Sequence, residues 1–159
     1  MTRIGIGYDV HKLDYGEELH IGGIKIPSDV GSVGHSDGDA LCHAIVDALL
    51  GAAGLGDIGT FFPSGDDAWE DAQSSIFLID ALSRINDAGY KINNIDTTII
   101  IQKPRLGNHI SKIKQSLSKI INLDESRISV KATTTDGLGT IGDSHGWAAL
   151  AVVSLMKPS

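Results

Sequence analysis

Apolar residues recur along this chain with two different periods, and the two periods predict separate strands and helices. Short segments rich in Ile, Val and Thr favour extended strands. The first of them predicts a short buried strand, and Gly22-Gly23 separates two others in the manner of a tight hairpin. Strands are expected at residues 3–8, 19–21, 24–26, 95–101, 127–132 and 147–156.

Leu, Ile and Ala at helical spacing predict three helices. Ser36 or Asp37 is expected to cap the first helix, because such side chains accept hydrogen bonds from free backbone N–H groups. Gly89 is typical of the end of the second helix. The glycine-rich segment 51–67 predicts a mobile loop. The helices are expected at about 40–50, 74–88 and 110–121.

The order of these elements favours an α+β fold, with segregated helices on a mixed or antiparallel sheet. The 159 residues fit a single domain, taken here as 1–159. A hydrophobic content of 42% and a charged content of 21% are ordinary for a globular chain. Apolar runs stay well short of the ~20 residues that span a bilayer, so a membrane partner is not expected.

The net charge and the cysteine content limit which binding partners and which cellular compartment are expected for this protein. The net charge of −7 argues against non-specific nucleic-acid binding. The single cysteine, Cys42, excludes an internal disulfide and fits a reducing compartment. The beginning of the chain lacks a signal pattern. A cytoplasmic location in a bacterium is therefore expected, or a plastid location if the chain is a processed mature form.

Asp9-Val10-His11 carries the most specific chemistry in the sequence. Side chains two residues apart on a strand share a face, so Asp9 and His11 are expected to point the same way. With His43 on the first helix they can hold a zinc ion and leave one position open, as in catalytic sites. The alternative is that Asp9 and His11 bind no metal. The spacing alone favours this alternative, because most Asp-x-His pairs bind no metal.

Asp39 and Asp47 lie four residues on either side of His43 on the predicted helix. A metal-bound imidazole commonly donates its other N–H group to a carboxylate, and we expect these two aspartates to supply it. The alternative is that both solvate an exposed stripe of the helix.

Four further segments have the composition of phosphate or sugar sites. His35-Ser36 precedes a helix start, where backbone N–H groups favour anions. Gly56-Asp57-Ile58-Gly59 permits close backbone approach, and Lys103-Pro104-Arg105 places two cations after a strand. Lys131 to Asp136 combines a lysine, three threonines and a carboxylate. Taken alone, the first segment is also typical of a helix cap, the second and third are more typical of ordinary turns, and three consecutive threonines often reflect plain β-propensity.

Together these segments resemble the 2-C-methyl-D-erythritol 2,4-cyclodiphosphate synthase family over nearly the whole chain. No single motif identifies the family, but their order and spacing are specific. The matching motifs are Arg3-Ile4-Gly5, Asp9-Val10-His11, Ile21-Gly22-Gly23, His35-Ser36-Asp37-Gly38-Asp39, His43, Asp47-Ala48-Leu49-Leu50-Gly51, Gly56-Asp57-Ile58-Gly59, Phe62-Pro63 and Lys131-Ala132-Thr133-Thr134.

The resemblance implies a ferredoxin-like subunit in a homotrimer, with active sites between subunits. It implies a phosphorus–oxygen lyase of non-mevalonate isoprenoid synthesis. The substrate would be 4-diphosphocytidyl-2-C-methyl-D-erythritol 2-phosphate, whose 2-phosphate attacks the β-phosphorus and releases CMP. Zinc would be held by Asp9, His11 and His43, and a second ion, Mg²⁺ or Mn²⁺, by Asp136.

The same resemblance assigns roles to individual residues. His35 and Thr134 would stabilise the transition state. His35-Ser36 and Asp57-Ile58-Gly59 would hold the methylerythritol phosphate, and residues 62–66 would continue that side of the site. Residues 101–107 and 132–135 would form the cytidine and diphosphate pocket, partly from a neighbouring subunit. These substrate-binding positions are Asp9, Val10, His11, His35, Ser36, Asp57, Ile58, Gly59, Phe62, Pro63, Ser64, Gly65, Asp66, Ile101, Gln102, Lys103, Pro104, Arg105, Leu106, Gly107, Ala132, Thr133, Thr134 and Thr135.

The chain departs from the family pattern at four positions. Asp136 is shorter than the usual glutamate, and Ser64 replaces an aspartate. Thr140 and Asp143 stand where many bacterial members have phenylalanine and arginine. That pair is associated with isoprenoid diphosphate binding in a central trimer cavity, so Asp143 predicts weak or absent binding there.

Two other functions are compatible with the same residues. A zinc-dependent phosphate-ester hydrolase would use the open metal position to activate water, and its product would contain solvent oxygen. A non-enzymatic nucleotide- or isoprenoid-binding trimer would keep its function after His43→Ala.

Overall fold

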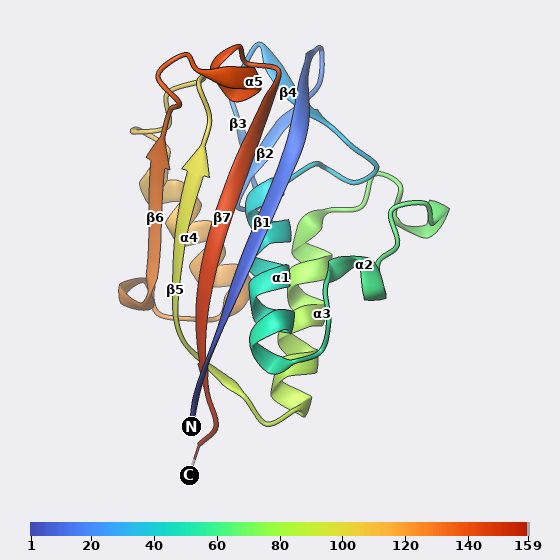
Figure 1. The fold of residues 1–159 in the computed structure, drawn as a ribbon, viewed down its shortest axis with the longest axis vertical. Coiled ribbons are helices and arrows are strands. Elements are labelled where there is room, and N and C mark those ends of the chain that lie inside the picture. Colours follow the sequence, from blue (N-terminus) through green and yellow to red (C-terminus); the bar gives the residue numbers. More distant parts are fainter. Residues whose placement is uncertain (159) are drawn as a thin grey trace.

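A five-stranded mixed sheet carries the main helices on one face in the computed structural model, which describes residues 1–158 (Figure 1). The strand order is β4-β1-β7-β5-β6, in which β5 and β6 are parallel and the other neighbours antiparallel. The predicted α+β class and mixed sheet are therefore confirmed. The strands are β1 (Thr2–Tyr15), β4 (Val30–Val33), β5 (Lys91–Ile100), β6 (Ile128–Thr133) and β7 (Gly146–Met156), with β2 (Leu19–Ile21) and β3 (Ile24–Ile26) in a separate hairpin.

The three predicted helices are present, and two short ones accompany them. Segment 51–67 is not one mobile loop as expected, because it contains the end of the first helix and a further helical turn. Strand β4 was not expected either. The helices are α1 (Ala40–Ala53), α2 (Ile58–Phe61), α3 (Ser74–Asp87), α4 (Ile110–Ile121) and α5 (Gly139–Gly142), with 3₁₀ turns at Asp67–Trp69 and Glu125–Arg127.

Asp39 caps α1, not Ser36 or Asp37 as the sequence predicted. Its carboxylate accepts a hydrogen bond from the backbone N–H of Cys42 at 3.1 Å, in the first turn of the helix. Asp39 is fully buried and also accepts from the N–H groups of Gly22 and Gly23 at 3.0 and 2.7 Å. The cap therefore also fastens the β2–β3 hairpin to the start of α1.

Strand β1 is longer than predicted, and most of its large apolar side chains are exposed rather than buried, although Leu13 lies in the core. Gly5 and Gly7 face α1 so closely that an added Cβ would lie 2.0 Å from the Ala48 oxygen and 1.8 Å from the Ala44 oxygen. The alternate residues lie on the other face of the sheet, away from the helices. They are Ile4, Ile6, Tyr8 and Val10, with exposed fractions of 71%, 70%, 54% and 51%.

The core lies between the sheet and α1, which is buried on nearly all sides. Leu41, Ile45 and Leu49 of α1 are fully buried with Ile99 of β5. The indole of Trp147 on β7 is also buried and donates to the Ser32 hydroxyl on β4 at 2.8 Å. Among residues 1–158, no helix has the length and apolarity needed to cross a membrane.

Candidate metal centre and substrate pockets

Asp9, His11 and His43 converge at the junction of β1 and α1. One ligand atom from each side chain lies within 4.8 Å of the other two. The Asp9 Oδ2 atom is 2.9 Å from His11 Nδ1 and 3.1 Å from His43 Nδ1. The strand places Asp9 and His11 on its helix-facing side, as their spacing predicted, and the second turn of α1 supplies His43.

The donor set fits a metal ion. His11 Nδ1 is buried and lacks a hydrogen-bond partner among the described residues, although Asp9 Oδ2 is near, because the two groups are not aligned for one. Two imidazole nitrogens and one carboxylate oxygen are ligands that zinc accepts, and with three protein ligands its fourth position stays open.

Electrostatics keep Asp9 ionised. Burial of Asp9 by itself raises its pKa, but the neighbouring imidazoles of His11 and His43 outweigh burial and lower the pKa to about 2. For His43, burial lowers the pKa, and the carboxylates led by Asp9 outweigh it and raise the pKa above its ordinary value. Asp9 and His43 therefore place a carboxylate charge and a basic imidazole nitrogen next to each other, and this combination favours the binding of a divalent cation.

A pocket of about 320 Å³ opens beside the three side chains. It includes many of the residues that the sequence assigned to the methylerythritol phosphate. Trp69 and Phe77 were not predicted; they pack around Phe62, with ring centroids 5.0 and 4.6 Å from it. The lining is Asp9, His11, His35, Ser36, His43, Ile58, Gly59, Phe62, Pro63, Ser64, Trp69 and Phe77.

Four of the predicted residues do not line this pocket. The Val10 side chain lies on the open face of the sheet. Asp57 caps α2 by accepting from the Thr60 N–H at 2.9 Å. Asp66 caps the following 3₁₀ turn, while its carbonyl oxygen is 3.2 Å from His35 Nε2. Gly65 lies beside it in the same loop.

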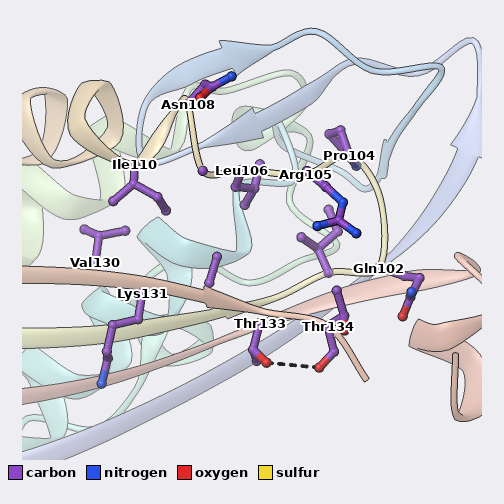
Figure 2. Close-up of a pocket in the computed structure, with 13 residues that line it drawn as sticks. Gln102, Pro104, Arg105, Leu106, Asn108, Ile110, Val130, Lys131, Thr133 and Thr134 are labelled. Carbon is purple, nitrogen blue, oxygen red and sulfur yellow. Dashed lines mark hydrogen bonds between the residues drawn. The ribbon is translucent and has the colours of Figure 1, made fainter. Parts of the chain in front are cut away.

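A second pocket, of about 530 Å³, lies at the ends of β5 and β6. Figure 2 shows Pro104 and Arg105 on the loop across from Thr133 and Thr134. The pocket contains most of the predicted cytidine and diphosphate segment, but not Lys103 or Thr135. Its lining is Ile101, Gln102, Pro104, Arg105, Leu106, Gly107, Asn108, Ile110, Val130, Lys131, Ala132, Thr133 and Thr134.

The two pockets have no residue in common. Asp9 pairs with Ala149, which pairs with Ile99, which pairs with Ala132. Three strand spacings of about 4.8 Å therefore separate Asp9 from Ala132, or roughly 14 Å. The residues predicted to be catalytic, His35 and Thr134, fall in different pockets of one chain.

Asp136 lies outside both pockets, in the turn after β6. It has a positive φ of 53°, and its N–H donates to the Thr134 hydroxyl at 3.2 Å. It is not one of the three side chains that converge on the candidate metal centre.

Asp39 and Asp47 form no hydrogen bond with the His43 imidazole, whose ring nitrogens face Asp9, Ser36 and Ser74 instead of the two expected aspartates. Asp39 is committed to backbone N–H groups, as described above. Asp47 accepts from the Ile58 N–H at 2.7 Å, which fixes the start of α2 beside the pocket. Besides the Ser36 hydroxyl at 3.3 Å, the nearer partner of His43 Nε2 is the buried Ser74 hydroxyl at 2.8 Å. Sequence spacing gave no sign of this contact, because α3 begins 31 residues after His43.

The fold and the site together define an α+β protein in which three side chains able to bind a metal ion converge beside a pocket. The chain belongs to the YgbB family, whose model matches residues 2–156. A protein of Alkaliphilus oremlandii named 2-C-methyl-D-erythritol 2,4-cyclodiphosphate synthase is 50% identical over 155 residues, which are 98% of this chain and 99% of that protein.

Solved structures agree with this assignment. The bifunctional IspDF from Campylobacter jejuni has a TM-score of 0.96 and 38% identity, covering 100% of this chain and 43% of that one. A CDP complex of IspF from Plasmodium falciparum has a TM-score of 0.87 and 40% identity, covering 99% and 97% of the two chains. The family resemblance inferred from the sequence is confirmed, and neither the hydrolase nor the non-enzymatic alternative is favoured.

Proposed function

We propose that this protein converts 4-diphosphocytidyl-2-C-methyl-D-erythritol 2-phosphate to 2-C-methyl-D-erythritol 2,4-cyclodiphosphate and CMP. The 2-phosphate of the substrate is the nucleophile and the β-phosphorus is the electrophile, so no protein nucleophile takes part. The proposal is supported by family membership and by two pockets whose residues match the two halves of such a substrate.

In this proposal Asp9, His11 and His43 hold zinc, and Asp136 holds a second ion, Mg²⁺ or Mn²⁺. Divalent ions supply Lewis-acid polarisation and charge neutralisation of phosphate oxygens. Charge neutralisation is needed because bringing two like unit charges to about 4 Å costs roughly 4 kcal/mol at an effective dielectric of about 20. A polyanion that folds back on itself contains several such pairs.

The side chains of the smaller pocket orient the methylerythritol phosphate. His35 and Ser36 donate hydrogen bonds to its phosphate oxygens, and Ile58-Gly59 contacts the polyol. The aromatic wall of Phe62, Trp69 and Phe77 excludes water from the reacting centre. Catalysis then consists of positioning the attacking oxygen in line and stabilising the spread phosphoryl charge.

The larger pocket binds the cytidine diphosphate portion in this proposal. Arg105 and Lys131 offset diphosphate charge, and Ala132 to Thr135 line the nucleotide. Thr134 donates to the developing charge, opposite His35. Because one chain holds these two residues in separate pockets, the complete site is formed by two subunits.

A homotrimer of ferredoxin-like subunits would join the two pockets. The exposed apolar residues of the open sheet face support association, because a contiguous patch of large apolar side chains is typical of an interface. Ile4, Ile6, Tyr8 and Val10 of β1 provide this patch with Val152 of β7. The bacterial relative is in keeping with a bacterial cytoplasmic location.

The observation that carries the proposal is the convergence of Asp9, His11 and His43 inside the pocket that also contains His35 and Ser36. Phosphorus NMR of the protein with substrate, zinc and Mg²⁺ tests it. We expect CMP and the cyclic diphosphate to form together. Linear products labelled from water enriched in heavy oxygen would indicate a hydrolase instead.

A further inference from the structure

The hydroxyl group of Ser74 lies between His43 and Asp37. Its Oγ atom is 2.8 Å from His43 Nε2 and donates a hydrogen bond to Asp37 Oδ1. Ser74 is fully buried at the first residue of α3. Hydrogen bonds thus connect Asp37, Ser74 and the candidate metal ligand His43 in series.

The proton positions in this series follow from the number of donors. The Asp37 carboxylate accepts from the backbone N–H groups of Asp39 at 3.1 Å and Ser74 at 2.9 Å, so it acts as an acceptor throughout. The Ser74 hydroxyl has one proton, and its hydrogen bond to Asp37 uses it. The Ser74 oxygen then has only lone pairs for His43, and Nε2 must carry the proton.

Ser36 does not reverse this assignment. Its hydroxyl oxygen lies 3.3 Å from His43 Nε2, farther than Ser74, and 3.4 Å from the N–H of Gly38. A protonated Nε2 donates to both serine oxygens, whereas an unprotonated Nε2 would face the Ser74 oxygen with two lone pairs opposed.

We propose that Asp37 and Ser74 are positioning residues that hold His43 in the Nε2–H form and present its Nδ1 lone pair to the metal. This inference rests on the proposed metal centre. Nδ1 is the nitrogen that faces Asp9, at 3.1 Å from Oδ2. The hydrogen bond made by one imidazole nitrogen decides which nitrogen ligates, so the two residues determine the geometry of the centre.

The backbone around this series holds it in place. The Asp37 N–H donates to the Ala72 oxygen at 3.1 Å, and the Asp71 N–H donates to the His35 oxygen at 2.8 Å. The segment before α3 is therefore joined to the segment before α1. Phe77, one turn after Ser74 on α3, packs against the His43 ring with centroids 5.8 Å apart and limits its rotation.

Two measurements on the full chain test the inference. The first is ¹⁵N NMR of the zinc-loaded protein, in which we expect a protected Hε2 proton on His43 and a metal-bound Nδ1. The second is zinc affinity by competition with a chromophoric chelator. Ser74→Ala should lose the Hε2 signal and bind zinc about 10- to 100-fold more weakly.

Ser75→Ala is the matched control, since it makes the same change at the next residue of the helix, and the Ser75 side chain forms no hydrogen bond within residues 1–158. It should keep both the signal and the affinity. Asp37→Asn should shift the Hε2 signal, because an amide can donate to Ser74 and release its proton toward His43.

The inference is overturned if zinc-loaded wild-type protein carries the proton on Nδ1, a result that does not depend on the folding of any variant. It is also overturned if Ser74→Ala binds zinc as tightly as Ser75→Ala with an unchanged signal. Failure of the wild-type protein to bind zinc would overturn the metal centre itself, so the two failures are distinguishable.

Discussion

Gly7 of β1 lies against the backbone of Ala44 in α1, where an added Cβ would be 1.8 Å from the Ala44 oxygen. Ala44 follows His43 directly, and Asp9 is the next residue after Gly7 on the same face of the strand. Because position 7 has no side chain, the strand and the helix approach closely enough for Asp9 and His43 to come within 3.1 Å.

Gly7→Ala should therefore reduce both stability and zinc affinity. Overpacking of this kind costs about 1–3 kcal/mol in the free energy of unfolding, which urea denaturation measures. Gly51→Ala is the control, because Gly51 is exposed within α1 and nothing lies within 4 Å of its added Cβ. It should instead stabilise the protein by roughly 0.5–1 kcal/mol. Equal effects of the two substitutions would contradict the close-packing argument.

Asp9→Asn should weaken zinc binding, because a neutral amide is a poorer ligand than a carboxylate. We expect a loss of at least about tenfold, measured as metal content after dialysis and by chelator competition. Asp14→Asn removes an exposed carboxylate from the same strand and should leave zinc binding unchanged. Full metal retention in Asp9→Asn would rule out this ligand assignment.

His43→Ala should abolish turnover while the fold is retained, since the side chain removed belongs to the site. Thr134→Ala should lower turnover by about 10²- to 10³-fold, as expected when one donor to the transition state is lost. Circular dichroism and thermal unfolding of each variant provide the check on folding. Wild-type turnover in His43→Ala would favour a non-enzymatic binding role.

Mixed trimers of these two variants should recover activity, because the two residues lie in different pockets and the proposed site spans two subunits. Random mixing in equal amounts leaves about a quarter of the interfaces with both intact halves, so up to about a quarter of wild-type turnover is expected. The variants are refolded together and assayed for CMP release. If each subunit contained a whole site, mixing would restore nothing.

Ile6→Glu should dissociate the proposed trimer, because it places a charge in the apolar patch of β1. Light scattering after size-exclusion chromatography would report monomers, and turnover should be lost with the interface. Ile79→Glu makes the same change at an isoleucine of α3 that is 55% exposed, outside the patch, and should remain trimeric. A trimer in both variants would exclude this face as the interface.

Local pattern was sufficient for most of the fold. The isoleucine-rich segment of β5 and the amphipathic repeat of α4 contain their own signals. Helix α4 has the predicted bounds, whereas β5 begins at Lys91, four residues before the predicted start. Strand β4 was missed because it is four residues long and contains a glycine. For β1, the sequence pattern predicted the alternation of side chains correctly, but it did not predict which face of the strand is buried. Two glycines, not the isoleucines, pack against α1.

The candidate site was predictable in its ligands but not in the residues that support them. Asp9, His11 and His43 stand out because few residue types bind zinc. Ser74 is chemically ordinary in the sequence, and its contact with His43 exists only because α3 packs beside α1. Asp39 and Asp47 had the right spacing, but the backbone N–H groups of neighbouring segments bind them more directly.

The proposed function requires a three-ligand metal centre that faces a nucleotide pocket of another subunit. Anomalous scattering at the zinc edge, from crystals soaked with CDP, measures it most directly. From this proposal we expect one strong peak about 2.0–2.3 Å from side-chain atoms of Asp9, His11 and His43, with CDP in the neighbouring subunit's pocket of Ile101 to Thr134. A zinc-replete crystal without a peak at these three residues would contradict it.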